Sequence, residues 1–284
     1  MAVEISARHR VFDGELAYGR HDSRATGTAM RLAVFIPPGK GPHPYAIWLS
    51  GLTCTEENFT HKAGAWGEAA RLGLAVVVPD TSPRGEGVPD DPAYDLGQGA
   101  SFYVDATEAP WSAHFRIETY VTVDLIAAVE TAFPLAGGRR GIFGHSMGGH
   151  GALTLALRHP DLFAGVSAFA PIAAPSQCPW GRKAFTAYLG PDAALWRAHD
   201  ATAIIEHGAD EALFRGLFDD ILIDQGGADP FLGDQLMPER LARACARTGQ
   251  RLTLRMREGY DHSYFFVASF IAEHLAFHAA RLGR

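Results

Sequence analysis

Short apolar segments alternate with amphipathic segments along most of the chain. The apolar segments have the length of β-strands, are rich in β-branched residues and are bounded by Pro, Gly or Asp. We expect strands over 30–38, 45–51, 74–80, 140–145, 165–171, 220–226 and 252–257. Apolar residues at helical spacing predict helices over roughly 60–72, 116–133, 147–159, 236–248 and 263–282.

This alternation predicts a single α/β domain over 1–284, with a mostly parallel central sheet and helices on both faces. The runs 74–79 and 165–170 are apolar throughout, as in strands that are covered on both sides. Two other stretches, 81–115 and 171–200, look irregular. Because loops of that length in a compact domain are usually functional, we expect them to form cap or substrate loops.

Composition narrows the possible partners and the location. The formal net charge of −7 argues against nucleic acid or an anionic membrane as the main partner. The first residues lack the apolar core of a secretory signal, and no apolar run is long enough to span a bilayer. Three widely separated cysteines do not suggest a disulfide framework. We therefore expect a cytoplasmic protein.

The segment Gly144-His145-Ser146-Met147-Gly148 joins an expected strand to an expected helix. A serine between glycines in such a turn is typical of a nucleophile elbow, in which the hydroxyl projects above the edge of the sheet. A glycine-rich turn without chemistry is the alternative, but the strand–turn–helix context favours the elbow. A phosphate-binding loop is excluded because no Lys-Ser or Lys-Thr follows the glycines.

A serine nucleophile needs a histidine base. His262 follows the last expected strand and precedes the last expected helix, which places it at the carboxyl edge of the sheet, where active sites of α/β proteins form. His274 and His278 stand at helical spacing in the last expected helix. No Glu lies between them as in a zinc-protease motif, so we interpret them as a surface pair and expect no metal site.

The base needs an acid to orient it, and in this fold the acid precedes the histidine in the chain. Asp224, Asp229 and Asp234 follow or end the strand at 220–226. We favour Asp229, because a loop aspartate beyond the strand end can reach the imidazole. Asp261 adjoins His262, but neighbouring residues on a turn point apart, so we expect it to stabilise the loop.

The oxyanion of the reaction needs backbone N–H donors. Met147 follows the serine and begins a helix, so its N–H is one candidate. A second strand runs into Gly51, followed by a polar turn, which makes the N–H of Leu52 the other candidate. Cys54 lies close to this turn. We expect it to be either a small buried side chain or a thiol near the acyl pocket.

With these residues in place, the sequence resembles the S-formylglutathione hydrolase (esterase D) family from about residue 10 to 282. The resemblance rests on the segments LSGLTCTEENF, KAGAW, PDTSPRGE, FYVDATEAPW, GHSMGGHGAL, SAFAPI, CPWGRKAF, YLG and EGYDHSYFF. It implies an α/β-hydrolase fold and hydrolysis of the thioester S-formylglutathione to glutathione and formate, without a cofactor. It also implies a homodimer. One departure is Ser101, where the family usually has glycine.

Carried over by motif, the resemblance implies Ser146 as nucleophile, Asp229 as acid, His262 as base, and Leu52 and Met147 as oxyanion donors. Glutathione is anionic and needs a cationic partner, and a small acyl group needs a narrow pocket. The candidates for these contacts are Lys62, Lys183, Arg84, Arg182, Trp111 and Trp180. A general short-chain carboxylesterase with the same triad and an inactive binding protein of the same fold are the alternatives.

Overall fold

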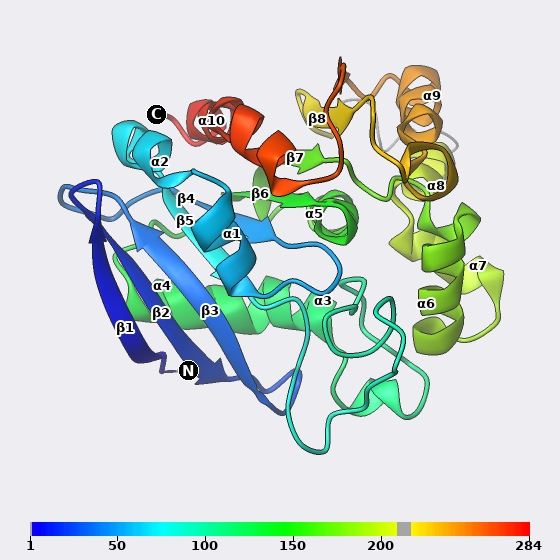
Figure 1. Cartoon of the computed structure of the whole chain (residues 1–284), viewed down its shortest axis with the longest axis horizontal. Coiled ribbons are helices and arrows are strands. Elements are labelled where there is room, and N and C mark those ends of the chain that lie inside the picture. The colour runs from blue at the N-terminus through cyan, green and yellow to red at the C-terminus, as the bar shows by residue number, and fades with distance from the viewer. Residues whose placement is uncertain (1, 209–216) are drawn as a thin grey trace.

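The computed structural model describes residues 2–208 and 217–284, and its strands form one mixed sheet (Figure 1). The strands are β1 (Glu4–Val11), β2 (Gly14–Asp22), β3 (Ala29–Ile36), β4 (Tyr45–Leu49), β5 (Ala75–Pro79), β6 (Arg140–His145), β7 (Phe163–Phe169), β8 (Ile221–Gly226) and β9 (Leu252–Arg257). Their order in the sheet is β1-β2-β3-β5-β4-β6-β7-β8-β9. From β5 to β9 neighbouring strands run parallel, whereas β1, β2, β3 and β5 pair antiparallel.

Helices cover both faces of this sheet. They are α1 (Glu56–Lys62), α2 (Trp66–Leu72), α3 (Ile117–Thr119), α4 (Ile126–Ala132), α5 (Met147–Arg158), α6 (Pro179–Leu189), α7 (Ala193–Trp196), α8 (Ala201–Gly208), α9 (Pro238–Thr248) and α10 (Tyr264–Arg281). Helices α1, α2 and α10 pack together over one face, and α5 packs on β4, β6 and β7. No helix in the described ranges is long and apolar enough to cross a membrane.

The alternation of residues along β4 explains why the sheet is covered on both sides. Trp48 points toward α1, where it packs on Phe59 with ring centroids 4.3 Å apart. Tyr45 has the opposite orientation and donates a hydrogen bond to Glu130 on α4. Every residue of β4 and β5 is buried, which agrees with their apolar sequences. The mostly parallel sheet with helices on both faces that the sequence predicts is therefore confirmed.

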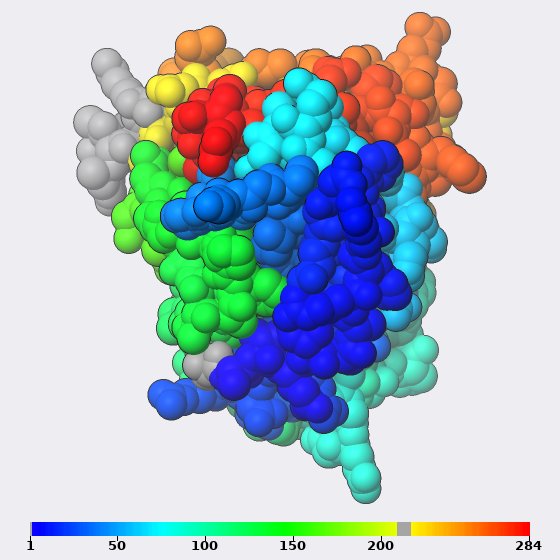
Figure 2. All heavy atoms as spheres, turned by 90° about the vertical axis from the view of Figure 1, so that its left-hand side faces the viewer, coloured from blue at the N-terminus to red at the C-terminus, as the bar shows by residue number. Residues whose placement is uncertain are grey.

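All seven expected strands are present, but the sequence analysis missed an N-terminal hairpin. Strands β1 and β2 lie at the edge of the sheet, which faces the viewer in Figure 2, and most residues of β1 are exposed or half-buried. Phe12 and Asp13 form its turn with positive φ angles of 44° and 60°. An edge strand in contact with solvent needs no apolar run, so apolar segments did not reveal it.

Two helical expectations need correction. The helix expected over 60–72 is two helices, α1 and α2, separated at Gly64, whose φ is 65°. The region 171–200, expected to be irregular, contains α6 and α7. The region 81–115 is mostly irregular, as expected. Helix α6 begins with a proline after Cys178, a position that proline favours, and buries the side of the helix that carries Trp180, Ala184 and Tyr188.

The interpretation of His274 and His278 as a surface pair is wrong. Both imidazoles are fully buried between α10 and the sheet. His274 Nδ1 and His278 Nε2 each lie 2.9 Å from the Ser167 hydroxyl on β7, and His274 Nε2 lies 3.2 Å from Asp224 Oδ2. These histidines therefore tie the last helix to the sheet.

Candidate active site

The nucleophile elbow forms where β6 ends and α5 begins. Ser146 has φ 58° and ψ −121°, a strained conformation for a residue with a side chain. A Cβ at Gly144 would lie 2.3 Å from the Gly148 carbonyl oxygen, and a Cβ at Gly148 would lie 2.0 Å from that of Leu49. Both positions must therefore be glycine, and the tight turn they permit aims the serine side chain away from the sheet.

His262 and Asp229 meet beside this serine. His262 Nδ1 lies 2.6 Å from Asp229 Oδ2, and the other carboxylate oxygen accepts the Phe231 N–H at 2.9 Å. Gln225 donates a further bond of 3.2 Å to Asp229 Oδ2. Because an ionised carboxylate can only accept, Nδ1 carries the proton and Nε2 presents a lone pair. This tautomer is the one that a general base for a serine requires.

Ser146 and His262 line the same pocket. The Ser146 hydroxyl makes no hydrogen bond to His262 or to any other described residue in this arrangement. Catalytic hydrogen bonds of this kind often become short only when substrate is bound.

The other aspartates near His262 have different partners. Asp224 is fully buried and accepts hydrogen bonds from Arg255, Arg257 and His274. Burial favours a higher pKa for this carboxyl, but the three donors outweigh burial and hold its pKa well below the ordinary value. Asp261 accepts from the Ser263 N–H and hydroxyl at the start of α10. Of these three aspartates, Asp229 is therefore the one that hydrogen-bonds to the His262 imidazole.

His145 packs against His262, and no role for it was predicted from the sequence. Its ring centroid lies 4.5 Å from that of His262, and its Nε2 has no hydrogen-bond partner among the described residues. Burial, and secondarily the nearby His262, lower the pKa of His145 well below its ordinary value. His145 is therefore neutral, so it places no positive charge beside the His262 ring.

Two backbone N–H groups are free to bind an oxyanion. The Met147 N–H opens α5 and the Leu52 N–H lies in the turn after β4, and neither donates to another described residue. Gly51 brings the two segments together, since a Cβ there would lie 3.1 Å from the Ser146 Cβ. This arrangement fits an oxyanion hole beside the serine.

The serine opens into a pocket of about 330 Å³. Its aromatic walls include Tyr94, Trp180, Phe231 and Tyr264. Trp180 donates to the Tyr94 hydroxyl at 3.1 Å, and the rings of Trp180 and Phe231 have centroids 4.8 Å apart. A wider hollow of about 650 Å³ lies along β1, β2 and α1, but no residue of the proposed triad lines it.

The residues expected to contact substrate separate into three groups. Trp180 and Cys54 line the pocket, and the Lys62 ammonium lies 5.9 Å from the centroid of Tyr264 at its wall. Lys183 is paired with Asp95 and Arg84 with Asp80. The expectation that Trp111 lines the cleft is not supported by its position, because its ring packs edge-to-face against Phe115 and Tyr188 in the core.

The sequence analysis did not single out Tyr94, Phe231 or Tyr264 as wall residues. Phe231 and Tyr264 each follow a proposed catalytic residue by two positions, which was a usable signal. Tyr94 lies in the irregular segment 81–115 and carried no such signal. No cluster of three His, Cys, Asp or Glu side chains within 2–208 and 217–284 is arranged to hold a metal ion.

The chain is similar to known esterases over most of its length. Residues 23–277 match a family model described as a putative esterase. The chain is 54% identical to an S-formylglutathione hydrolase of Paracoccus denitrificans, over all of this chain and 99% of the relative. The structure of an S-formylglutathione hydrolase from Agrobacterium tumefaciens is 46% identical, covers 98% of this chain and 99% of its own, and superposes with a TM-score of 0.94.

A more distant likeness shows the fold alone. A fluorophosphonate-binding serine hydrolase of Staphylococcus aureus, 19% identical, has a TM-score of 0.74 over 94% of this chain and 98% of its own. The family match and the two close relatives span nearly the whole chain. The chain therefore belongs to the esterase family of α/β-hydrolases, in the group of the S-formylglutathione hydrolases.

Proposed function

We propose that this protein hydrolyses S-formylglutathione to glutathione and formate through a formyl-serine intermediate. The observation that carries the proposal is the pocket with aromatic walls into which Ser146 opens, with His262 beside it and Asp229 hydrogen-bonded to the imidazole. The family and the two close relatives support the same substrate. No step of the proposed reaction requires a metal or an organic cofactor.

In the first half of the reaction, Ser146 Oγ attacks the formyl carbon while His262 Nε2 takes the hydroxyl proton. The carbonyl oxygen becomes an oxyanion that accepts the Leu52 and Met147 N–H groups. The carbon–sulfur bond then breaks, and the His262 proton goes to the departing glutathione sulfur. Because a thiolate with an ordinary pKa of about 8.5 is a good leaving group, we expect this half to be fast.

In the second half, water attacks the formyl-serine ester. His262 takes a proton from the water and returns it to Ser146 Oγ as formic acid leaves, which releases its proton to solvent and becomes formate. Asp229 keeps the imidazole in the same tautomer through both halves. The two halves therefore restore the enzyme with one water consumed.

Trp180 and Phe231 support selection of the formyl group, since they form part of the pocket wall beside Ser146 and His262. Lys62 is the cation we propose for a glutathione carboxylate, because it is exposed near Tyr264 and forms no ion pair with a described residue. Lys62→Met should raise KM for S-formylglutathione and leave KM for p-nitrophenyl acetate unchanged. An equal effect on both substrates would contradict this role.

The acyl series tests the proposal as a whole. S-formylglutathione should give a much higher kcat/KM than S-acetylglutathione or p-nitrophenyl butyrate. Equal values for all three would favour a general short-chain carboxylesterase, and no turnover of any would favour an inactive binding protein. The expected cytoplasmic location and homodimer stay predictions; light scattering after size-exclusion chromatography tests the dimer.

A further inference from the structure

The loop that carries the Leu52 N–H contains a strained residue. Thr53 has φ 66°, in the left-handed region that β-branched residues rarely adopt. Such a conformation persists only where the surrounding structure holds it in place. Since Thr53 directly follows Leu52, its conformation affects where the Leu52 peptide sits.

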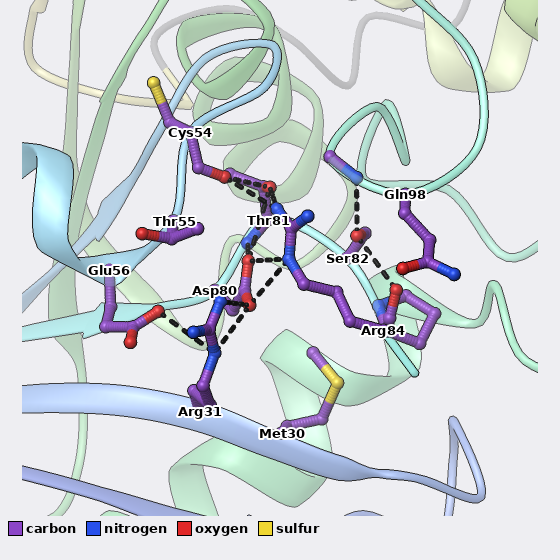
Figure 3. Close-up of polar contacts among 12 residues, drawn as sticks. Met30, Arg31, Cys54, Thr55, Glu56, Asp80, Thr81, Ser82, Arg84 and Gln98 are labelled. Carbon is purple, nitrogen blue, oxygen red and sulfur yellow. Dashed lines mark hydrogen bonds and ion pairs between the residues drawn. The ribbon is translucent and has the colours of Figure 1, made fainter. Parts of the chain in front are cut away.

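Hydrogen bonds hold this loop on both sides of the strained residue. On one side, the Thr53 N–H donates to the Gly99 carbonyl at 2.9 Å. On the other, the Cys54 carbonyl accepts from Thr81 Oγ1 at 2.6 Å and from Arg84 Nη2 at 3.0 Å. Figure 3 shows the Cys54 carbonyl turned toward Thr81 and Arg84, with the sulfur on the other side.

Asp80, just beyond the end of β5, holds both donors in position. Asp80 is 2% exposed, and its carboxylate accepts the Thr81 N–H at 2.7 Å and pairs with Arg84 Nε at 2.9 Å (Figure 3). Arg31 from β3 donates to the same carboxylate at 2.8 Å and lies 3.7 Å from a Glu56 carboxylate oxygen, so two guanidinium groups face two carboxylates. Asp80 does not hydrogen-bond to the loop itself among the described residues, so it acts through Thr81 and Arg84.

The segment that receives Thr53 is fixed to the same place. Ser82 Oγ accepts the Gly99 N–H at 2.7 Å, and Ser101 Oγ donates to the Thr81 carbonyl at 2.5 Å. The Ser101 hydroxyl therefore adds a second tie between the two segments.

We propose that Asp80, Thr81 and Arg84 are positioning residues that hold the Leu52 N–H in line with the oxyanion. The inference rests on the proposed function, because it assumes that Leu52 supplies an oxyanion donor. The three residues contact the loop or each other and lie outside the set of residues that line the pocket. Their effect is therefore expected in the transition state rather than in substrate binding.

Two pairs of variants test this role. Thr81→Val removes the hydroxyl and keeps the volume, whereas Thr81→Ser restores the donor. Arg84→Met removes the bond to Cys54, whereas Arg31→Met removes an ion pair to the same aspartate without touching the loop. The measurements are kcat and KM, the thermal midpoint, and the inhibition constants of a trifluoromethyl ketone, whose serine adduct carries an oxyanion, and of glutathione.

Thr81→Val and Arg84→Met should each lower kcat and trifluoromethyl ketone affinity by about tenfold, a fraction of the 10²–10³ that loss of a whole oxyanion donor costs. KM and glutathione affinity should not change. Thr81→Ser and Arg31→Met should retain the wild-type preference for the ketone over glutathione, even where the thermal midpoint falls.

The inference is overturned if Arg84→Met and Arg31→Met both lower the thermal midpoint but keep the wild-type preference for the ketone over glutathione. The role of the network would then be only structural. Measuring p-nitrophenyl acetate hydrolysis beside the thioester separates the two proposals. If the wild type hydrolyses the ester but not S-formylglutathione, the proposed substrate is wrong and the positioning role is still measured on the ester.

Discussion

Asp229→Asn should nearly abolish turnover and leave the fold intact. The Asp229 side chain is fully buried, and its Oδ2 lies 2.6 Å from His262 Nδ1. An asparagine amide can donate to Nδ1, which leaves the proton on Nε2 and removes the lone pair that accepts the serine proton. Loss of the correct tautomer lowers kcat by about 10⁴, or about 5.5 kcal/mol. The bond from the Phe231 N–H persists, so unfolding free energy should fall by less than about 1.5 kcal/mol.

The matched control is Asp224→Asn, the same substitution within β8, the strand that precedes the Asp229 loop. Asp224 is fully buried and its charge is compensated by Arg255, Arg257 and His274. Neutralising it weakens the ion pairs of two half-buried guanidinium groups, which keep Glu273 as a second partner, and this should destabilise the fold by about 1.5–3 kcal/mol. Turnover should stay near the wild-type value at temperatures where the variant remains folded.

Both variants are measured by S-formylglutathione turnover and by urea unfolding. The reasoning predicts opposite patterns: lost activity with retained stability for Asp229→Asn, and retained activity with lost stability for Asp224→Asn. An Asp229→Asn enzyme with near wild-type kcat would show that another group orients His262. A folded Asp224→Asn enzyme without activity would point to Asp224 as that group.

Three further predictions concern acid stability, the acyl pocket and the thiol. Burial lowers the pKa of His150 to about 3 and the pKa of His278 well below its ordinary value. Because both pKa values in the folded state lie below the unfolded value of about 6.5, these histidines stabilise the fold above that pH and lose this contribution as the pH falls. The loss is up to about 1.4 kcal/mol per histidine per pH unit. Thermal melts should show this loss below about pH 6.5, and an unchanged midpoint down to about pH 5 would contradict it. Trp180→Ala should raise the kcat/KM ratio of acetyl to formyl thioester, and an unchanged ratio would remove Trp180 from acyl selection. Iodoacetamide should inhibit the wild type by alkylating the Cys54 thiolate. Inhibition should be faster at higher pH, because burial raises the pKa of the Cys54 thiol. Equal inhibition of Cys54→Ser would assign the effect to another thiol.

The sequence predicted best what is encoded locally. The elbow could be identified because Gly144, Ser146 and Gly148 are close in sequence and stand between an expected strand and an expected helix. The order of Ser146, Asp229 and His262 follows from the order of the parallel strands, which the apolar segments revealed. Both features could be predicted from residue types and from the order of segments along the chain.

What the sequence did not reveal depends on distant contacts. His274 and His278 look like exposed helical residues until Ser167 and Asp224 are placed beside them. Arg84 looks like a free cation for glutathione until Asp80 and the Cys54 carbonyl are seen to occupy it. In such cases the role of a residue depends on the groups that surround it. Those groups are known only once the fold is known.

The measurement that tests the central claim most directly is mass spectrometry of the enzyme quenched during turnover of S-formylglutathione. The account predicts that the peptide containing Ser146 gains the mass of one formyl group, and that Ser146→Ala, folded and still binding glutathione, gains none and releases no formate. A formyl group on a different residue, or steady formate release by Ser146→Ala, would contradict it.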